Sequence, residues 1–373
     1  MNRILILTAG FGEGHNAAAR ALATAVDREA GPGTAAVVDI FAEAAPKFNA
    51  TARAGYLALI NRAPLAWSRF YHWVDQSRIV ERRLGLFARE AEVLRRLLER
   101  ESFGAVCCTF PVCTFLLDQL ARRGGPNPPR FNVVTDSISI HSLWWRAPCD
   151  GWFLPNEDSA DVIIKAGVEP ARVHVSGFPV PPFFADRRAE LSPPDLATGA
   201  APRVLQIINS GRRNALATAR QLLANDHWEV TCAVGRDAAL HRQLSAFAAN
   251  RRRPATILGW THEIPRLLMT HHVVVSKAGG ATTQEAINAL CPMIVSQVVP
   301  GQEEGNYELL RRHGIGALAT TSNQVIDSLH HAFADRGRVW KNWRAALGPI
   351  ARPYAARDIA QQVLSAIETA TVA

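Results

Sequence analysis

The strongest chemical pattern in this chain is a glycine turn followed by a polar loop. An apolar run at 272–275 predicts a buried strand, and a pair of glycines at 279–280 leads from it into a helix. Such a turn presents free backbone N–H groups and the positive end of a helix dipole to an anion. The next predicted strand, 293–299, runs into the polar loop 300–306. Loops that follow neighbouring parallel strands share one sheet edge, so the pattern predicts a phosphate site with polar groups beside it.

Thr282 and Glu285 at the start of that helix allow two interpretations. Their spacing matches a capping box, in which the carboxylate returns to the N-terminal backbone. The same carboxylate could instead accept hydrogen bonds from the two neighbouring hydroxyls of a ribose. The residues alone favour the cap.

A second glycine-rich turn, Gly10 to Gly14, follows the first predicted strand and precedes His15. Glycines permit the close backbone approach that a binding turn needs. A helix start keeps a histidine neutral, as a general base must be. A tight turn with His15 as a partly exposed capping residue explains the pattern equally well.

Asp136 follows a central predicted strand and should lie at the same sheet edge as His15. A carboxylate there could orient the imidazole. The more common role of an aspartate after a strand is to cap a turn or a helix.

Residues 53–100 form a basic, aromatic stretch with ten arginines and five acidic side chains. Amphipathic helices rich in arginine and tryptophan suit the headgroup region of an anionic bilayer. A helix pair with a solvated basic face is the simpler interpretation. A nucleic-acid groove is a third, but no RNA- or DNA-binding motif accompanies the stretch. The residues proposed for contact with a membrane or an acceptor are Trp67, Arg69, Tyr71, Trp73, Arg82 and Arg83.

Composition narrows the class of protein. The 373 residues are 48% hydrophobic and carry a net charge of +8, which favours a globular protein with an anionic partner. We expect no signal peptide and no spanning helix, and we interpret the six cysteines as reduced thiols of a cytosolic protein. No metal-ligand spacing, serine-hydrolase motif or P-loop occurs, so no tightly bound metal is expected.

Strands and helices alternate along the chain, which predicts parallel sheets covered by helices. Helices are expected at 16–26, 48–73, 78–100, 337–347 and 355–369. The predicted strands are 3–8, 35–40, 105–109, 132–134, 152–154, 173–176, 204–208, 229–234, 255–258, 272–276, 293–299 and 317–319. Proline clusters between 180 and 202 predict a linker. We therefore expect two α/β domains, 1–180 and 203–350, with a cleft between them, and a C-terminal helix at 351–373 that could cross back to the first domain.

Six ordered motifs carry a resemblance to a known family. They are ILILTAGFGEGH, VVTDSISIHSLWW, GWFLPNEDSADVIIKAGVEPARVHVSGFPV, AVGRD, LGWTHEIPRLL and SKAGGATTQEAINALCPMIVSQVVPGQEEGN. Over about 1–350 the chain resembles the monogalactosyldiacylglycerol synthase and processive diacylglycerol glucosyltransferase family, which is similar to glycosyltransferase family 28. More remotely, it is similar to the N-acetylglucosaminyltransferase that makes lipid II.

The resemblance implies a GT-B fold, with two Rossmann-like domains facing across a cleft, and a UDP-sugar donor held mainly by the second domain. It identifies His15 with the proposed base and Glu285 with the ribose ligand. It places the diphosphate on the turn at 279–282. The expected donor-binding residues are Gly14, Ser210, Arg212, Gly235, Arg236, Trp260, Thr261, Lys277, Gly279, Gly280, Ala281, Thr282, Glu285, Gln302, Glu303 and Asn306.

Together, the residues and the resemblance predict an inverting, metal-independent hexosyltransferase. It would move a hexose from a UDP-sugar to a lipid acceptor such as diacylglycerol, with His15 and Asp136 as the catalytic pair. We expect a cytoplasmic, peripheral protein on the inner face of an anionic membrane, without a nucleic-acid partner. The alternatives are a UDP-N-acetylglucosamine-dependent transferase or epimerase acting on another substrate, and a non-catalytic binding module.

Overall fold

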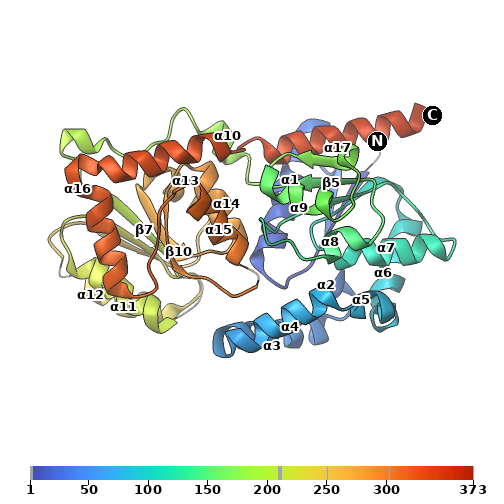
Figure 1. The fold of residues 1–373 in the computed structure, drawn as a ribbon, viewed down its shortest axis with the longest axis horizontal. Coiled ribbons are helices and arrows are strands. Elements are labelled where there is room, and N and C mark those ends of the chain that lie inside the picture. The colour runs from blue at the N-terminus through green and yellow to red at the C-terminus, as the bar shows by residue number, and fades with distance from the viewer. Residues whose placement is uncertain (1–2, 209–211, 250, 302, 373) are drawn as a thin grey trace. The chain divides into compact units, whose positions relative to one another are not determined.

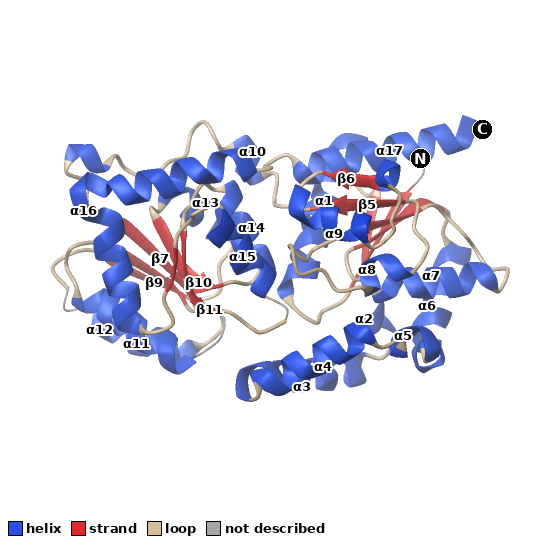
Figure 2. Ribbon diagram, in the orientation of Figure 1, coloured by secondary structure: helices blue, strands red, loops and turns tan. Residues whose placement is uncertain are grey.

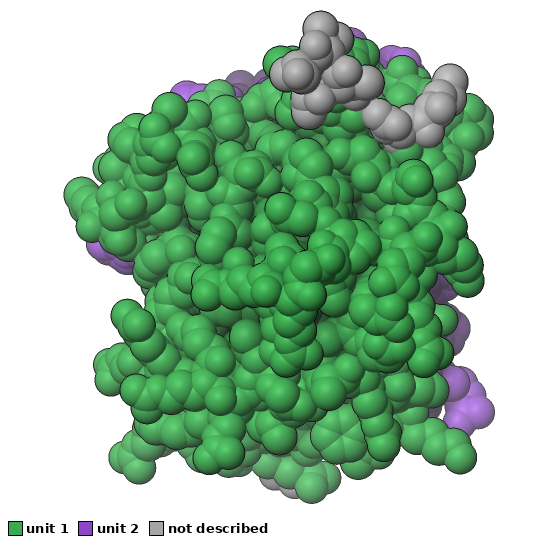
Figure 3. Space-filling model, turned by 90° about the vertical axis from the view of Figure 1, so that its right-hand side faces the viewer, with its two compact units in different colours: residues 1–182, 300–305, 352–373 green, residues 183–299, 306–351 purple. Residues whose placement is uncertain are grey.

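The computed structural model describes residues 3–208, 212–249, 251–301 and 303–372, apart from the side chains of Leu57, Asn61, Arg212, Arg213 and 370–372. The chain forms two compact units, coloured separately in Figure 3. Unit 1 contains residues 1–182, 300–305 and 352–373, and unit 2 contains 183–299 and 306–351.

Unit 1 is built on a six-stranded parallel sheet with the order β2-β1-β3-β4-β5-β6. Its strands are β1 (Arg3–Thr8), β2 (Ala35–Asp39), β3 (Phe103–Cys108), β4 (Arg130–Val133), β5 (Gly151–Leu154) and β6 (Val173–Val175). The chain reverses its direction of travel across the sheet between β1 and β3. In open α/β sheets, ligands bind outside the carboxyl ends of the strands at such a reversal.

Helices cover both faces of this sheet (Figure 2). Ile4 and Ile6 of β1 pack against α1 (Glu13–Ala30) and α17 (Ala355–Val372). The alternating residues Leu5 and Leu7 belong to a second core. That core includes side chains of α2 (Ile40–Ala44), α6 (Ala88–Arg100) and α7 (Val112–Arg122). The strand is therefore apolar on both sides, as burial on both faces requires.

Between α2 and α6 the chain forms a segment of helices, seen in blue in Figure 1, which we call the arm (residues 46–87). It contains α3 (Pro46–Arg62), α4 (Pro64–Gln76), α5 (Ile79–Arg82) and the short helix η1 (Leu84–Phe87). The sequence predicted one helix over 48–73, but the structure breaks it at Ala63. A residue before proline is disfavoured in the helical conformation, so Pro64 instead starts a new helix.

The remaining elements of unit 1 lie between its last strands. They are α8 (Leu143–Arg146), α9 (Glu157–Lys165) and η2 (Pro170–Arg172). The short helix α8 follows the loop after β4, where Asp136 was expected to act.

Unit 2 has its own six-stranded parallel sheet, ordered β12-β11-β10-β7-β8-β9. Numbered from the first strand of this unit, the order is 3-2-1-4-5-6, the Rossmann arrangement with its reversal between β7 and β10. The strands are β7 (Arg203–Ile207), β8 (Glu229–Ala233), β9 (Ala255–Leu258), β10 (Val273–Lys277), β11 (Met293–Gln297) and β12 (Ala317–Leu318). All twelve strands expected from the sequence are present in the two sheets.

Helices flank the sheet of unit 2 on both faces (Figure 2). They are α10 (Phe183–Asp186), η3 (Leu196–Thr198), α11 (Arg212–Ala224), α12 (Ala238–Ala248), α13 (Ile264–Thr270), α14 (Gly280–Asn288), α15 (Glu304–Arg312), α16 (Ser322–Leu347) and η4 (Gly348–Ile350). The helix predicted at 337–347 is the second part of α16, which begins at Ser322 and has non-helical backbone at 334–337.

A buried histidine, His272, joins three parts of unit 2 at the start of β10. Its Nδ1 accepts a hydrogen bond from the Arg203 N–H, and its Nε2 lies 2.9 Å from the Pro194 carbonyl oxygen. The indole N–H of Trp340 donates to the His272 carbonyl at 2.7 Å. Burial lowers the pKa of His272 to about 4, and burial likewise lowers the pKa of the adjacent His271 to about 4.

We therefore predict that unit 2 loses stability as the pH falls from 6.5 to 4. In that range the unfolded histidines bind protons that the folded ones exclude, which costs roughly 3 kcal/mol for each histidine at the acid end. Urea unfolding followed by pulsed hydrogen exchange measures the free energy of unfolding of unit 2, because peptides from β10 report on that unit separately from unit 1. His272→Gln should flatten the pH dependence, with the exposed His262→Gln as the control. An unchanged slope in His272→Gln would contradict the assignment.

Candidate functional site

His15 lies at the reversal point of the unit 1 sheet. The first helix, α1, begins at Glu13, three residues earlier than predicted, so His15 lies in its first turn. Its Nδ1 is 2.7 Å from the carbonyl oxygen of Thr109 and 2.8 Å from Oγ1 of Thr135. These residues follow β3 and β4 respectively. The ends of three strands therefore fix one imidazole.

The surroundings of the ring keep His15 neutral. Phe110 lies edge-on with its ring centroid 5.2 Å away, and the Trp144 centroid is at 6.4 Å. Burial lowers the pKa of His15 to about 4, although the hydrogen bond to Thr109 acts in the opposite direction. A neutral imidazole can accept a proton near pH 7, which is what a general base has to do.

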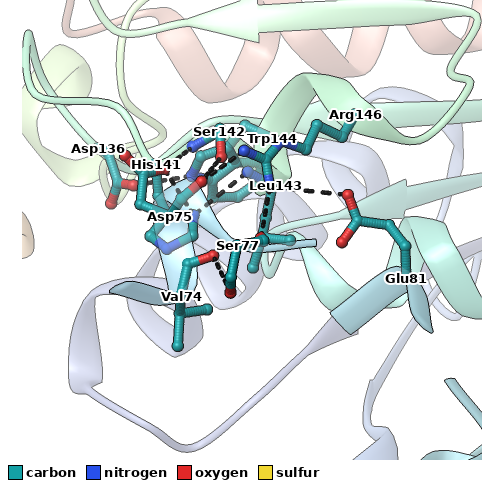
Figure 4. Close-up of polar contacts among 10 residues, drawn as sticks. All are labelled: Val74, Asp75, Ser77, Glu81, Asp136, His141, Ser142, Leu143, Trp144 and Arg146. Atoms are coloured by element: carbon teal, nitrogen blue, oxygen red, sulfur yellow. Dashed lines mark hydrogen bonds and ion pairs between the residues drawn. The ribbon is translucent and has the colours of Figure 1, made fainter. Parts of the chain in front are cut away.

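Asp136 does not have the orienting role that the sequence suggested. Its Oδ2 accepts a hydrogen bond from the indole N–H of Trp144 at 2.8 Å, as Figure 4 shows. Burial raises the pKa of Asp136, while the bond from Trp144 lowers it. The groups that contact Nδ1 of His15 are the Thr109 carbonyl and the Thr135 hydroxyl, so the expectation for Asp136 is corrected here.

Asp75 attaches the end of α4 to the loop after β4 (Figure 4). Its Oδ1 accepts from the Ser142 N–H at 2.6 Å, and its carbonyl accepts from the Ser142 hydroxyl at 2.8 Å. Arg146 donates to the carbonyl oxygens of Asp75 and Ser77, and it lies 3.7 Å from Glu81. Both acidic side chains of the arm therefore face this loop.

The six arm residues proposed for membrane contact divide into two groups. Trp73 is 53% exposed, and Arg69, Arg82 and Arg83 are exposed as well. Tyr71 instead packs edge-on against His141 with ring centroids 4.9 Å apart. Burial, with the nearby Asp136 carboxylate, raises the pKa of the Tyr71 phenol well above its ordinary range.

Trp67 is also half-buried, between Tyr56 and Tyr71. Phe70, an aromatic residue of the same basic stretch, is exposed as well. Sequence reasoning missed three other apolar side chains of the arm that are strongly exposed, namely Phe48, Leu65 and Leu86. One sequence signal could have identified them. Large apolar residues lie beside arginines on short helices that lack a continuous apolar face, a pattern that indicates exposed apolar side chains.

In unit 2, the glycine turn has the geometry of an anion site. The helix α14 begins at Gly280 with Gly279 as its N-cap, and its first helical hydrogen bond runs from the Thr283 N–H to the Gly279 carbonyl. The three preceding N–H groups, 280–282, have no acceptor within the helix. Thr282 and Glu285 lie inside this helix, so they are not its capping box. The role of Glu285 as a ribose ligand stays a prediction.

Asn306 extends this site from the start of α15. Its Nδ2 donates to the Ala278 carbonyl at 3.0 Å, and its buried Oδ1 has no partner among the described residues. An oxygen held in this way can accept a hydrogen bond from a ligand hydroxyl. Lys277 ends β10, directly before the turn.

Arg236 and Trp260 come together at the ends of β8 and β9. The guanidinium lies 5.7 Å from the centroid of the Trp260 ring, which is 57% exposed. Gly235 precedes Arg236 with a φ of 61°, and Thr261 Oγ1 accepts from the Glu263 N–H. An exposed indole beside a cation is suited to stacking on a planar, electron-poor ring.

Several predicted donor residues lie outside the described residues of unit 2 or belong to unit 1. Ser210 and Gln302 lie outside the described residues, as does the side chain of Arg212. Glu303 is buried in the segment 300–305, which belongs to unit 1. Gly14 lies in the first turn of α1 beside His15. The donor-binding roles of all these residues stay predictions.

The structure holds no assembled metal-ligand set among the residues that it describes: no three His, Cys, Asp or Glu side chains could hold an ion together. The expectation of a reaction without a tightly bound metal stays a prediction. Among the described helices, none is both long and apolar enough to cross a bilayer.

Comparison with known proteins adds a family and a fold. A model of the family described as monogalactosyldiacylglycerol (MGDG) synthase matches residues 15–180. The chain is 25% identical over 339 residues to a processive diacylglycerol beta-glucosyltransferase of Bacillus subtilis (strain 168), covering 89% of this chain and 87% of that relative.

Two solved structures match nearly the whole chain at 12% identity, each with a TM-score of 0.62. One is MurG of Acinetobacter baumannii, with 98% of this chain and 100% of that chain covered. The other is the UDP co-structure of S. aureus MnaA, with 99% and 97% covered. The expected GT-B fold, with two Rossmann-like domains, is confirmed. The family model covers residues 15–180 and the relative matches most of the chain at 25% identity, so this protein is similar to the monogalactosyldiacylglycerol synthase family.

Proposed function

We propose that the protein transfers a hexose from a UDP-sugar to the hydroxyl of a lipid, with diacylglycerol as the acceptor, and inverts the anomeric configuration. The observation that carries this proposal is His15, a neutral imidazole held at the sheet reversal of unit 1. The name of the Bacillus subtilis relative supports the acceptor and the sugar class.

In the proposed reaction, His15 removes the acceptor proton while the acceptor oxygen attacks the anomeric carbon. The bond from that carbon to the UDP oxygen breaks, and its electron pair leaves with UDP. A single displacement of this kind inverts the anomeric centre. General base catalysis of this step is worth about 10²- to 10⁴-fold in rate.

The leaving diphosphate would be stabilised by the helix start at Gly279–Thr282. Backbone N–H groups and the helix dipole are already oriented there, so they stabilise developing charge without reorganisation. Glu285 would hold the ribose hydroxyls, and Asn306 Oδ1 a sugar hydroxyl. Trp260 would stack on the uracil with Arg236 beside it. We propose that no tightly bound metal takes part.

The arm would hold the protein at the cytoplasmic face of an anionic membrane. It has seven lysine and arginine residues against Asp75 and Glu81. The contacts of these two acids with Ser142 and Arg146 leave the exposed surface basic. Phe48, Leu65, Phe70, Trp73 and Leu86 add exposed apolar side chains. Basic and apolar side chains on one segment suit the headgroup boundary.

We predict that His15→Ala lowers the rate of transfer by about 10²- to 10⁴-fold with UDP affinity nearly unchanged, because the base contributes to chemistry and not to donor binding. Glu285→Ala should instead raise the donor KM. Release of UDP with diacylglycerol in detergent micelles measures the rates, and titration calorimetry with UDP measures affinity.

Two results would contradict this function. The first is that the His15→Ala variant loses UDP binding but keeps transfer activity. The other is turnover of UDP-sugar without acceptor at the same rate as with diacylglycerol, which would indicate epimerase or hydrolase chemistry instead.

We predict that the double variant Phe70→Ser, Trp73→Ser reduces binding to vesicles that contain phosphatidylglycerol. The double variant Arg82→Gln, Arg83→Gln should weaken it too, by about 1 kcal/mol for each arginine at low salt. Flotation of liposomes separates bound from free protein. Phe247→Ser in unit 2 removes a comparably exposed ring and serves as the control. Equal binding of the arm variants and this control would exclude the arm as the contact.

A further inference from the structure

The hydrogen bonds of His15 determine which of its two nitrogens can accept a proton. The Thr109 carbonyl oxygen, 2.7 Å from Nδ1, can only accept a hydrogen bond. Nδ1 must therefore carry the hydrogen. Because a neutral imidazole has one N–H, Nε2 must have the lone pair.

The Thr135 hydroxyl oxygen is the second neighbour of the same N–H, 2.8 Å from Nδ1. It cannot donate to Nδ1, whose lone pair is absent in this tautomer, so it acts as a second acceptor. Thr135 is buried, which holds the hydroxyl in place. The Nδ1–H is thus shared between a carbonyl and a hydroxyl.

The carbonyl of Thr109 is itself fixed by the sheet. The Thr109 N–H donates to the Leu7 carbonyl at 2.9 Å, and the Thr109 hydroxyl donates to the same oxygen at 3.2 Å. Thr109, whose carbonyl accepts from His15, is thereby tied to the end of β1 through its own N–H and hydroxyl. A rotation of Thr109 away from the ring would break these contacts with Leu7.

Charged groups on the elements around His15 include Glu13 and Arg20 on α1 and Asp136 after β4, and Asp39 and Arg53 lie close to the Gly10 turn. Glu13 pairs with Arg20, and Asp39 accepts from the Ala42 N–H. Asp136 accepts from Trp144. Among the residues that the structure describes, none of these carboxylates has a hydrogen bond to His15.

We propose that Thr135 and the Thr109 carbonyl are positioning groups that hold His15 as the Nδ1–H tautomer, so that Nε2 is the basic atom and no carboxylate takes part. This rests on the proposed role of His15 as the base. In the transfer step the acceptor O–H bond breaks, and its proton forms a bond to Nε2. The acceptor oxygen then bonds to the anomeric carbon as UDP leaves with the electron pair.

A base without a carboxylate partner has a recognisable pH dependence. Burial lowers the pKa of His15, and neutral acceptors stabilise the imidazolium less than a carboxylate would, so the base stays unprotonated well below pH 6.5. The acid limb of kcat/KM, which reports the free enzyme, should therefore lie near pH 4 instead of near 6.5.

The tautomer can be measured without any reference to activity. In the full-length protein labelled with ¹⁵N-histidine, long-range ¹H–¹⁵N spectra distinguish protonated from unprotonated ring nitrogens. The His15→Gln spectrum identifies the His15 signals by their loss. We expect Nδ1 to be protonated and Nε2 unprotonated from pH 7.5 to 5.5. An Nε2–H tautomer would overturn the proposal, even if His15→Ala abolishes transfer as the proposed function requires.

Three substitutions test the positioning role by kinetics. Thr135→Val should lower kcat on the order of tenfold, the value of one neutral hydrogen bond, with the donor KM retained. Thr135→Ser should restore the rate. Asp136→Asn keeps an acceptor for Trp144 but removes the charge, so it should leave the acid limb of the pH profile in place.

If Asp136 were the true partner, Asp136→Asn would cost on the order of 10⁴-fold, the loss seen when a carboxylate fixes a catalytic histidine. That result, or a Thr135→Val variant as fast as the parent, would overturn the proposal. UDP affinity and the His15 signals show whether each variant is folded. If valine disturbs the core, the Thr135→Ser variant still tests the proposal, because serine keeps the hydroxyl and should keep the rate.

Discussion

Parallel strand pairing determines where this protein can do chemistry. Every strand pair described is parallel, so each connection crosses a face of the sheet and returns to the same edge. The carboxyl ends of β1, β3 and β4 therefore lie side by side. His15 meets Thr109 and Thr135 there, although they are 94 and 120 residues away along the chain. In unit 2, parallel pairing likewise places the turn at Gly279 beside the point where the strand order reverses, between β7 and β10.

Much of this arrangement could be predicted from local patterns. Apolar runs bounded by turns located all twelve strands, because a strand buried on both faces has to be apolar throughout. The partner of His15 could not be predicted in this way. A main-chain carbonyl, such as that of Thr109, belongs to every residue type and leaves no signal in the sequence. Asp136 was the natural candidate by residue type, but the nearby Trp144 N–H occupies its carboxylate.

Helix starts and exposed faces were predicted less well, for a related reason. Thr282 and Glu285 have capping-box spacing, yet α14 begins earlier because Gly279 already turns the chain. In the arm, sequence periodicity could not show which side chains lack a neighbour. Tyr71 was expected at the surface but packs on His141, whereas Leu65 is exposed. Such differences depend on tertiary contacts that local spacing does not encode.

The last helix has a consequence for how the protein is made. Ile359, Ala360 and Val363 of α17 lie in the same core as Ile4 and Ile6 of β1. When the ribosome has synthesised β1 to β6, the helix α17 that completes one side of their hydrophobic core has therefore not yet been made. Unit 2 is complete in sequence by residue 351, before α17 exists. The unit that is translated first is thus the one that finishes folding last, and its apolar face stays open to chaperones and to aggregation throughout synthesis.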